Sequence, residues 1–146
     1  MSSLIETLKM KNSITALRIY ALIRIVVGFF VFYHGWEIFE SDKIAEYAKW
    51  EAFNRFSQAY WIAFFGKAAE FVAGIMLMIG FKTTWASVLL LGTMLFIVFY
   101  IGHGKVWYED QHPFLFALFA IQYMVVGAGI WSVDGLKKTS ATYPSV

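Results

Sequence analysis

The sequence predicts an all-α protein: a four-helix transmembrane bundle with an additional interfacial helix between the first and second spanning helices. Composition is the first reason, because 60% of the 146 residues are hydrophobic and 15% are charged, whereas soluble domains carry about 45–50% apolar and about 25% charged residues. The second reason is that the apolar residues fall into four segments of roughly membrane-spanning length. The lack of cysteine excludes disulfides and thiolate-held iron–sulfur clusters, and a net charge of +2 does not indicate nucleic acid as a partner.

Short polar connections separate the four apolar segments, and we interpret the chain, 1–146, as a single transmembrane domain. Residues 1–13 form a polar arm without the apolar core of a signal peptide, so we expect them to remain attached. Pro113 is predicted to open the fourth span, because proline is favoured at the first position of a helix. The predicted spans cover about residues 15–39, 60–80, 85–101 and 113–131.

The connection at residues 40–57 is charged but interleaved with Trp50, Phe53 and Phe56. That mixture is typical of a short helix lying on the membrane surface, which is the interfacial helix of the predicted fold. An ordered polar loop is the alternative.

The distribution of lysine and arginine residues between the two sides of the membrane predicts a cytoplasmic (inner) membrane protein with both termini in the cytoplasm. Four spans place both termini on one side, and that side carries seven basic residues against five on the other. The first set is Lys9, Lys11, Arg18, Arg24, Lys82, Lys137 and Lys138, and the second is Lys43, Lys49, Arg55, Lys67 and Lys105.

The second predicted span contains two ionisable residues, Lys67 and Glu70. A carboxylate near the bilayer centre costs about 3 kcal/mol on insertion scales and indicates a functional site. Gly66 and Gly74 lie one turn either side of Glu70 on the same helix face. Because glycines allow a neighbouring backbone to approach closely, we expect Glu70 to point into the bundle.

In the first span, Arg24, Gly28 and Gly35 share a face that matches the Gly66–Glu70–Gly74 face of the second. Helix rise places Arg24 about 10 Å and Glu70 about 15 Å from the same membrane surface. We therefore predict that the two faces pack together and that Arg24 pairs with Glu70. A buried ion pair that sets helix register and a proton-transfer site are the alternative interpretations of this pair.

Three stretches resemble the DoxX family of small four-helix membrane proteins: LIRIVVGFFVFYHGWEIF, EFVAGIMLMIGFKT and GAGIWSVDGL. The resemblance covers about residues 22–136, and it departs from the family at Glu37, where many relatives carry lysine. It implies a role in quinone-linked oxidation of sulfur compounds or in membrane oxidoreductase assemblies. The matching positions are Arg24, Gly28, His34, Gly35, Glu70, Gly74, Gly80, Gly127, Gly129, Ser132 and Asp134.

All three histidines fall in the predicted outer half of the membrane, His34 in the first span and His103 and His112 near the last connection. His34 and His103 are candidates to hydrogen-bond a quinone carbonyl, or to ligate a haem, although their unequal depth argues against haem. Interfacial histidines that bind loops are the plainer alternative. His103, Asp110 and His112 could hold zinc or copper, but their spacing is not diagnostic and we predict no metal site. Ser132 and Asp134 are expected to turn or cap the chain after the fourth helix.

Three classes of function follow. The first is a membrane subunit of a quinone-linked oxidoreductase assembly, with a polar site in the outer half of the bundle. The second is a non-catalytic anchor or scaffold for a partner enzyme, and the third is a small transporter or lipid-binding protein that would need to form a homo-oligomer. For the first class we predict Glu70, Arg24, His34 and His103 as catalytic residues, and Lys67, Glu37 and His112 as ligand-binding residues, with Lys67 neutralising Glu37 or Glu70. Since the chain has no intrinsic redox group, electrons would come from a bound cofactor or a partner oxidoreductase subunit.

Overall fold

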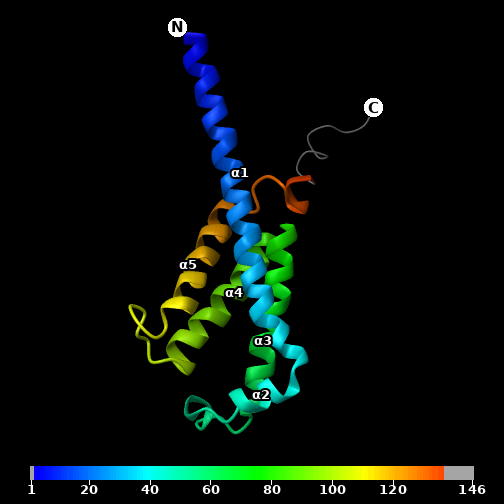
Figure 1. Cartoon of the computed structure of the whole chain (residues 1–146), viewed down its shortest axis with the longest axis vertical. Coiled ribbons are helices and arrows are strands. Elements are labelled where there is room, and N and C mark those ends of the chain that lie inside the picture. Colours follow the sequence, from blue (N-terminus) through cyan, green and yellow to red (C-terminus); the bar gives the residue numbers. More distant parts are fainter. Residues whose placement is uncertain (1, 137–146) are drawn as a thin grey trace.

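The computed structural model describes residues 2–136, with side chains from residue 13 onward, and this part of the chain is all helical with no strand. Figure 1 shows a long first helix, α1, against a bundle of α3, α4 and α5, with the short α2 across one end. The elements are α1 (Ser2–Gly35), η1 (Trp36–Phe39), α2 (Ser41–Tyr47), η2 (Glu51–Phe53), α3 (Ala59–Ile79), α4 (Thr83–Phe96), η3 (Ile97–Ile101) and α5 (Gln111–Val126). Four lysines used for the orientation prediction, Lys9, Lys11, Lys137 and Lys138, lie outside the described side chains.

Three helical stretches are long and apolar enough to cross a membrane: Ser13–Phe39, Ala59–Ile79 and Thr83–Ile101. The fourth, α5, is apolar but has only 16 residues. Large apolar side chains such as Phe29 and Phe65 are at least half exposed on the outside of the bundle, as expected where lipid replaces water. The chain is a multi-pass membrane protein.

Glycines allow α1 and α3 to pack backbone against backbone, as the sequence predicts. A methyl group on Gly28 would lie 2.7 Å from the backbone nitrogen of Met78, and one on Gly74 would lie 2.6 Å from the Cα of Phe32. Gly35 is equally closed in by α3. Gly66 differs from the prediction, because nothing lies within 4 Å of its added Cβ. Close backbone packing of α1 against α3 therefore occurs at Gly28, Gly35 and Gly74, whereas Gly66 borders open space.

The fourth helix ends five residues earlier than predicted, at Val126 instead of residue 131. Positive φ angles at Gly127 (83°), Gly129 (67°) and Trp131 (53°) take the chain out of the helix and back towards α1. There, the Tyr20 hydroxyl donates to the Gly127 carbonyl at 2.7 Å. If α5 continued as a helix, the Gly127 carbonyl would accept a hydrogen bond from within that helix. The contact with Tyr20 of α1 therefore helps to decide where α5 ends.

Asp134, in the segment that follows α5, caps a different helix from the one predicted. Its carboxylate accepts hydrogen bonds from the backbone N–H groups of Lys82 and Thr83, at 2.9 and 2.8 Å, at the start of α4. The Ser132 hydroxyl donates to the Gly129 carbonyl at 2.6 Å and accepts from the Gly135 N–H. The prediction that these residues turn or cap the chain after the fourth helix therefore holds for the turn at Ser132, whereas the cap made by Asp134 belongs to α4.

The connection between the first two spans is helical, as predicted. Ile44 of α2 and Phe53 of η2 pack with Ala63 of α3 in a small apolar cluster separate from the main core. Pro113 is the third residue of α5 and not its first, since the helix begins at Gln111. Proline is tolerated throughout a first turn because the N–H groups there lack intrahelical partners.

Candidate functional site

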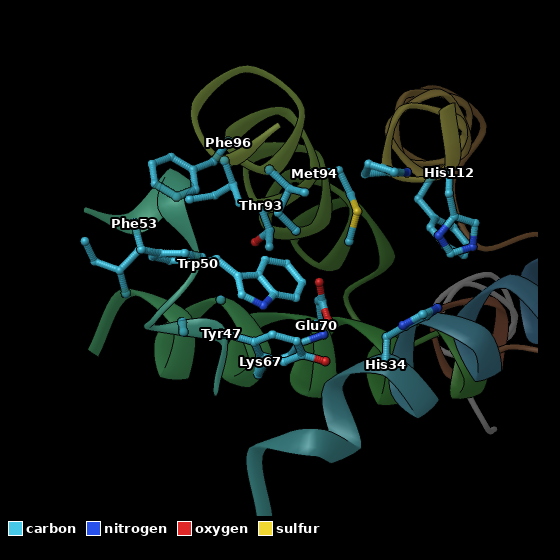
Figure 2. A pocket seen from close by; sticks show the side chains of 17 residues that line it. His34, Tyr47, Trp50, Phe53, Lys67, Glu70, Thr93, Met94, Phe96 and His112 are labelled. Carbon is cyan, nitrogen blue, oxygen red and sulfur yellow. Dashed lines mark hydrogen bonds and ion pairs between the residues drawn. The ribbon is translucent and has the colours of Figure 1, made fainter. Parts of the chain in front are cut away.

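A cavity of about 340 Å³ opens among α1, α3, α4 and α5 at the end of the bundle covered by α2. Figure 2 shows Glu70 and the Trp50 indole between α3 and α4, with His34 and His112 to one side and Phe53 and Phe96 to the other. Most of the wall is apolar. It is formed by His34, Tyr47, Trp50, Phe53, Ile62, Ala63, Gly66, Lys67, Glu70, Thr93, Met94, Phe96, Ile97, Ile101, His112, Pro113 and Phe116.

The acid of this cavity is paired with lysine and not with arginine. Glu70 is 4% exposed, and its carboxylate lies 3.2 Å from the Lys67 ammonium, one turn away on the same helix. The same ammonium lies 2.8 Å from the carboxylate of Glu37. Lys67 thus bridges both of the carboxylates between which the sequence leaves a choice, and the two acids share its single positive charge.

From Glu37, polar contacts continue to the surface of the protein. The Tyr47 hydroxyl donates to Glu37 at 2.7 Å, and the exposed ammonium of Lys43 lies 3.5 Å from the same carboxylate. Burial raises the pKa of the Tyr47 phenol, and the hydrogen bond to Glu37 raises it further, so Tyr47 remains a donor at neutral pH. A continuous series of polar side chains therefore joins Glu70 to the exterior.

The predicted Arg24–Glu70 pair is wrong. Arg24 is fully buried, but its Nη1 donates to the carbonyls of Leu77 and Met78, and its Nη2 donates to the carbonyl of Trp131 at 2.7 Å. The first two carbonyls belong to the last turn of α3, where a positive charge is favoured, and the Leu77 carbonyl also accepts from the Gly80 N–H. Arg24 accordingly fixes the segment after α5 against α1 and α3, at a distance from the cavity wall.

The histidines divide into a pair and an outlier. His34 and His112, from α1 and α5, face each other with ring centroids 5.1 Å apart, and His112 also contacts Phe116 at 4.8 Å. His103 is exposed after η3, where its backbone N–H and that of Lys105 donate to Asp110. Asp110 is therefore occupied in holding this loop, and no metal-binding group of three His, Cys, Asp or Glu occurs within residues 13–136.

Comparison with known families gives one result: the DoxX family model matches residues 19–103. The chain belongs to the DoxX family. No curated protein and no solved structure matched it. The matched region holds Arg24, His34, Glu37, Lys67 and Glu70, whereas the resemblance drawn from the sequence extends further, to Leu136.

Of the predicted site residues of this DoxX-family protein, His34, Lys67, Glu70 and His112 line the cavity, and Glu37 contacts Lys67 from its edge. Arg24 and His103 lie elsewhere. Sequence reasoning missed Tyr47, which anchors Glu37, and it assigned Trp50 and Phe53 to the membrane surface alone. The available signal was the mixture of aromatic and charged residues in the connection, which indicates an amphipathic segment but not that it covers the end of the bundle.

The arrangement offers an apolar cavity with a few polar groups at one side, the usual form of a small-molecule site. His34 and His112 can donate ring N–H groups, Lys67 can donate from its ammonium, and Glu70 can accept or release a proton. A flat ring in the cavity would contact the apolar side chains of Phe116, Met94 and Trp50. The residues present therefore fit an aromatic or quinonoid headgroup with oxygen substituents.

Proposed function

We propose that this DoxX-family protein binds the headgroup of a quinone in the cavity and acts as the membrane subunit of a quinone-linked oxidoreductase assembly. The observation that carries the proposal is the buried carboxylate of Glu70, which faces an otherwise apolar cavity together with Lys67 and the His34–His112 pair. Placing an ionisable group within a membrane helix costs free energy of insertion, and its presence there favours a functional role.

A bound quinone would supply two-electron, two-proton redox chemistry. The histidine N–H groups would donate hydrogen bonds to its carbonyl oxygens and orient the ring, and the apolar wall would exclude water. Glu70 is the proton-exchanging group, and the contacts through Lys67, Glu37 and Tyr47 connect it to the exterior. The chain has no cysteine to hold an iron–sulfur cluster, and in this proposal the electrons come from a bound cofactor or from a partner oxidoreductase subunit.

The proposal includes a four-crossing topology in the cytoplasmic membrane, with α5 as the fourth crossing and both termini in the cytoplasm. In this orientation the cavity opens in the outer half of the bilayer. The excess of basic residues on the side of the termini supports it.

The test is titration of the purified protein in detergent with a tail-less benzoquinone, followed by quenching of tryptophan fluorescence. Trp50 lies in the cavity wall, so binding should quench part of the emission, and Trp50→Phe should remove most of that change. His112→Phe, which removes a donor, should weaken binding roughly tenfold, the effect of losing one hydrogen bond of about 1.4 kcal/mol. His103→Phe is the matched control and should bind like the wild type. Equal affinity in the two histidine variants, or no saturable binding, would contradict the proposal.

A second candidate function is that of an anchor for a partner enzyme, and the length of α1 favours it. Its 34 residues extend about 51 Å, against a hydrocarbon core of about 30 Å. The N-terminal turns of α1 project beyond the other helices (Figure 1). A protein that binds no quinone but co-purifies with a soluble oxidoreductase, and loses it when residues 2–12 are deleted, would support this alternative.

A further inference from the structure

A second hollow lies on the outer face of the bundle, between α3 and α4. This groove has a volume of about 470 Å³ and is lined by these two helices. Four of its wall residues, Ile62, Gly66, Thr93 and Phe96, also belong to the wall of the cavity. The groove and the cavity therefore adjoin along this edge.

Two glycines keep the groove open. A methyl group added to Gly66 of α3 or to Gly92 of α4 would meet no atom within 4 Å. Both positions thus differ from Gly28, Gly35 and Gly74, where the missing side chain admits another backbone. Because neither glycine is needed for helix contact, its effect is to leave space between the cavity and the exterior of the bundle.

The groove faces lipid and follows the helix axis. Apart from Gly92, its remaining wall residues are Phe65, Val88 and Leu89, which are 64%, 46% and 39% exposed on the apolar exterior. Along α4 the wall extends from Val88 to Phe96 with helical spacing, which corresponds to about 12 Å. The groove therefore starts at the edge of the cavity, near one end of the bundle, and extends along α4 towards the middle of the membrane.

We propose that this groove is a lateral entrance to the cavity and holds the hydrocarbon tail of the quinone whose headgroup lies beside Glu70. The inference rests on the proposed function and specifies its ligand as a long-tailed quinone that enters from the lipid phase. A cavity of about 340 Å³ lies at the lower end of the range for ligand sites, so it suits a headgroup and leaves the tail outside. The groove between α3 and α4 shares part of the cavity wall and opens on the apolar exterior, so it offers the tail a place next to the headgroup.

The experiment uses two photoreactive benzoquinones with the purified full-length protein in lipid nanodiscs, one with a diazirine at the end of a ten-carbon tail and one with a diazirine on the ring. Cross-linked residues are identified by mass spectrometry. The tail probe should label the groove at Phe65, Val88 or Leu89, and the ring probe should label the cavity wall. An excess of unlabelled long-tailed quinone should suppress both.

The variant Gly92→Leu fills the groove at a residue that lines the groove and not the cavity, and because this site opens onto free space it should fold normally. It should weaken binding of the long-tailed quinone on the order of tenfold while leaving the tail-less quinone nearly unchanged. Val72→Leu, an exposed α3 position outside the groove, is the control and should behave like the wild type.

Tail labelling spread evenly over the lipid-facing helices, or equal loss of both quinones in Gly92→Leu, would overturn the inference while leaving the headgroup site intact. Failure of the tail-less quinone to bind the wild type would overturn the proposed function and this inference with it.

Discussion

Removing the Lys67 ammonium is the most direct test of the buried polar site. The variant Lys67→Met keeps the length and apolar stem of the side chain but leaves Glu70, whose side chain is 5% exposed, without its partner. Loss of one member of a buried ion pair costs about 3–5 kcal/mol. Because the Lys67 side chain is 17% exposed, we expect the lower end, about 3 kcal/mol of the free energy of unfolding.

Two further variants distinguish the energy of the Lys67–Glu70 ion pair from other effects of replacing Lys67. Glu70→Gln should cost only about 1 kcal/mol, because Lys67 keeps its contact with Glu37 and can donate to the amide oxygen. In the double variant Lys67→Met/Glu70→Gln no unpaired charge remains at residue 70. It should therefore be about 1–2 kcal/mol more stable than Lys67→Met alone, which is a coupling typical of contacting residues.

Unfolding in mixed micelles with increasing sodium dodecyl sulfate, followed by circular dichroism, measures these differences. Lys43→Met is the control, since that exposed lysine also lies near Glu37 but should leave the unfolding midpoint unchanged. If Lys67→Met unfolds at the midpoint of the control, or if the double variant loses the sum of the two single effects, the ion-pair argument is refuted.

Three further predictions concern helix packing, capping and the buried arginine. Gly35→Ala should destabilise the bundle by about 2 kcal/mol, because a methyl group there meets the α3 backbone, whereas Gly92→Ala should be neutral or slightly stabilising; equal effects in the unfolding titration would contradict this. Asp134→Ala should cost about 1 kcal/mol and speed hydrogen exchange at the first amides of α4, and unchanged exchange would rule out the cap. Arg24→Lys should increase proteolysis of the segment after α5, because one ammonium cannot reach the carbonyls of both segments; the exposed control Arg18→Lys should resist, and similar cleavage of the two would disprove the role.

The interior position of Glu70 could be predicted because its signals are local. Helix spacing places Gly74 on the same face as the acid, and membrane energetics directs that face inward. The same local geometry contains the correct partner, since Lys67 lies three residues away, a spacing that brings side chains together on one helix. A partner on another helix was a weaker prediction, because helix rise gives depth but not the rotation of one helix about its axis.

The end of α5 and the role of Arg24 depend on each other, which is why neither could be derived from the sequence. Residues after Val126 are apolar enough to continue a helix, and three positions with positive φ, two of them glycines, permit it to stop. Arg24 needs carbonyl acceptors in the interior, and the Trp131 carbonyl becomes available only when the helix ends. Two segments 107 residues apart in the chain settle both features together.

The sequence by itself determined the class of protein, the approximate spans, the family and the inward direction of the acid, since composition and helical periodicity act within one segment at a time. Tertiary structure alone decided that Glu37 joins the local Lys67–Glu70 pair, that His34 meets His112, and that a groove adjoins the cavity. These features depend on how helices distant in sequence are rotated and placed against one another, and close packing of many weak contacts fixes that arrangement.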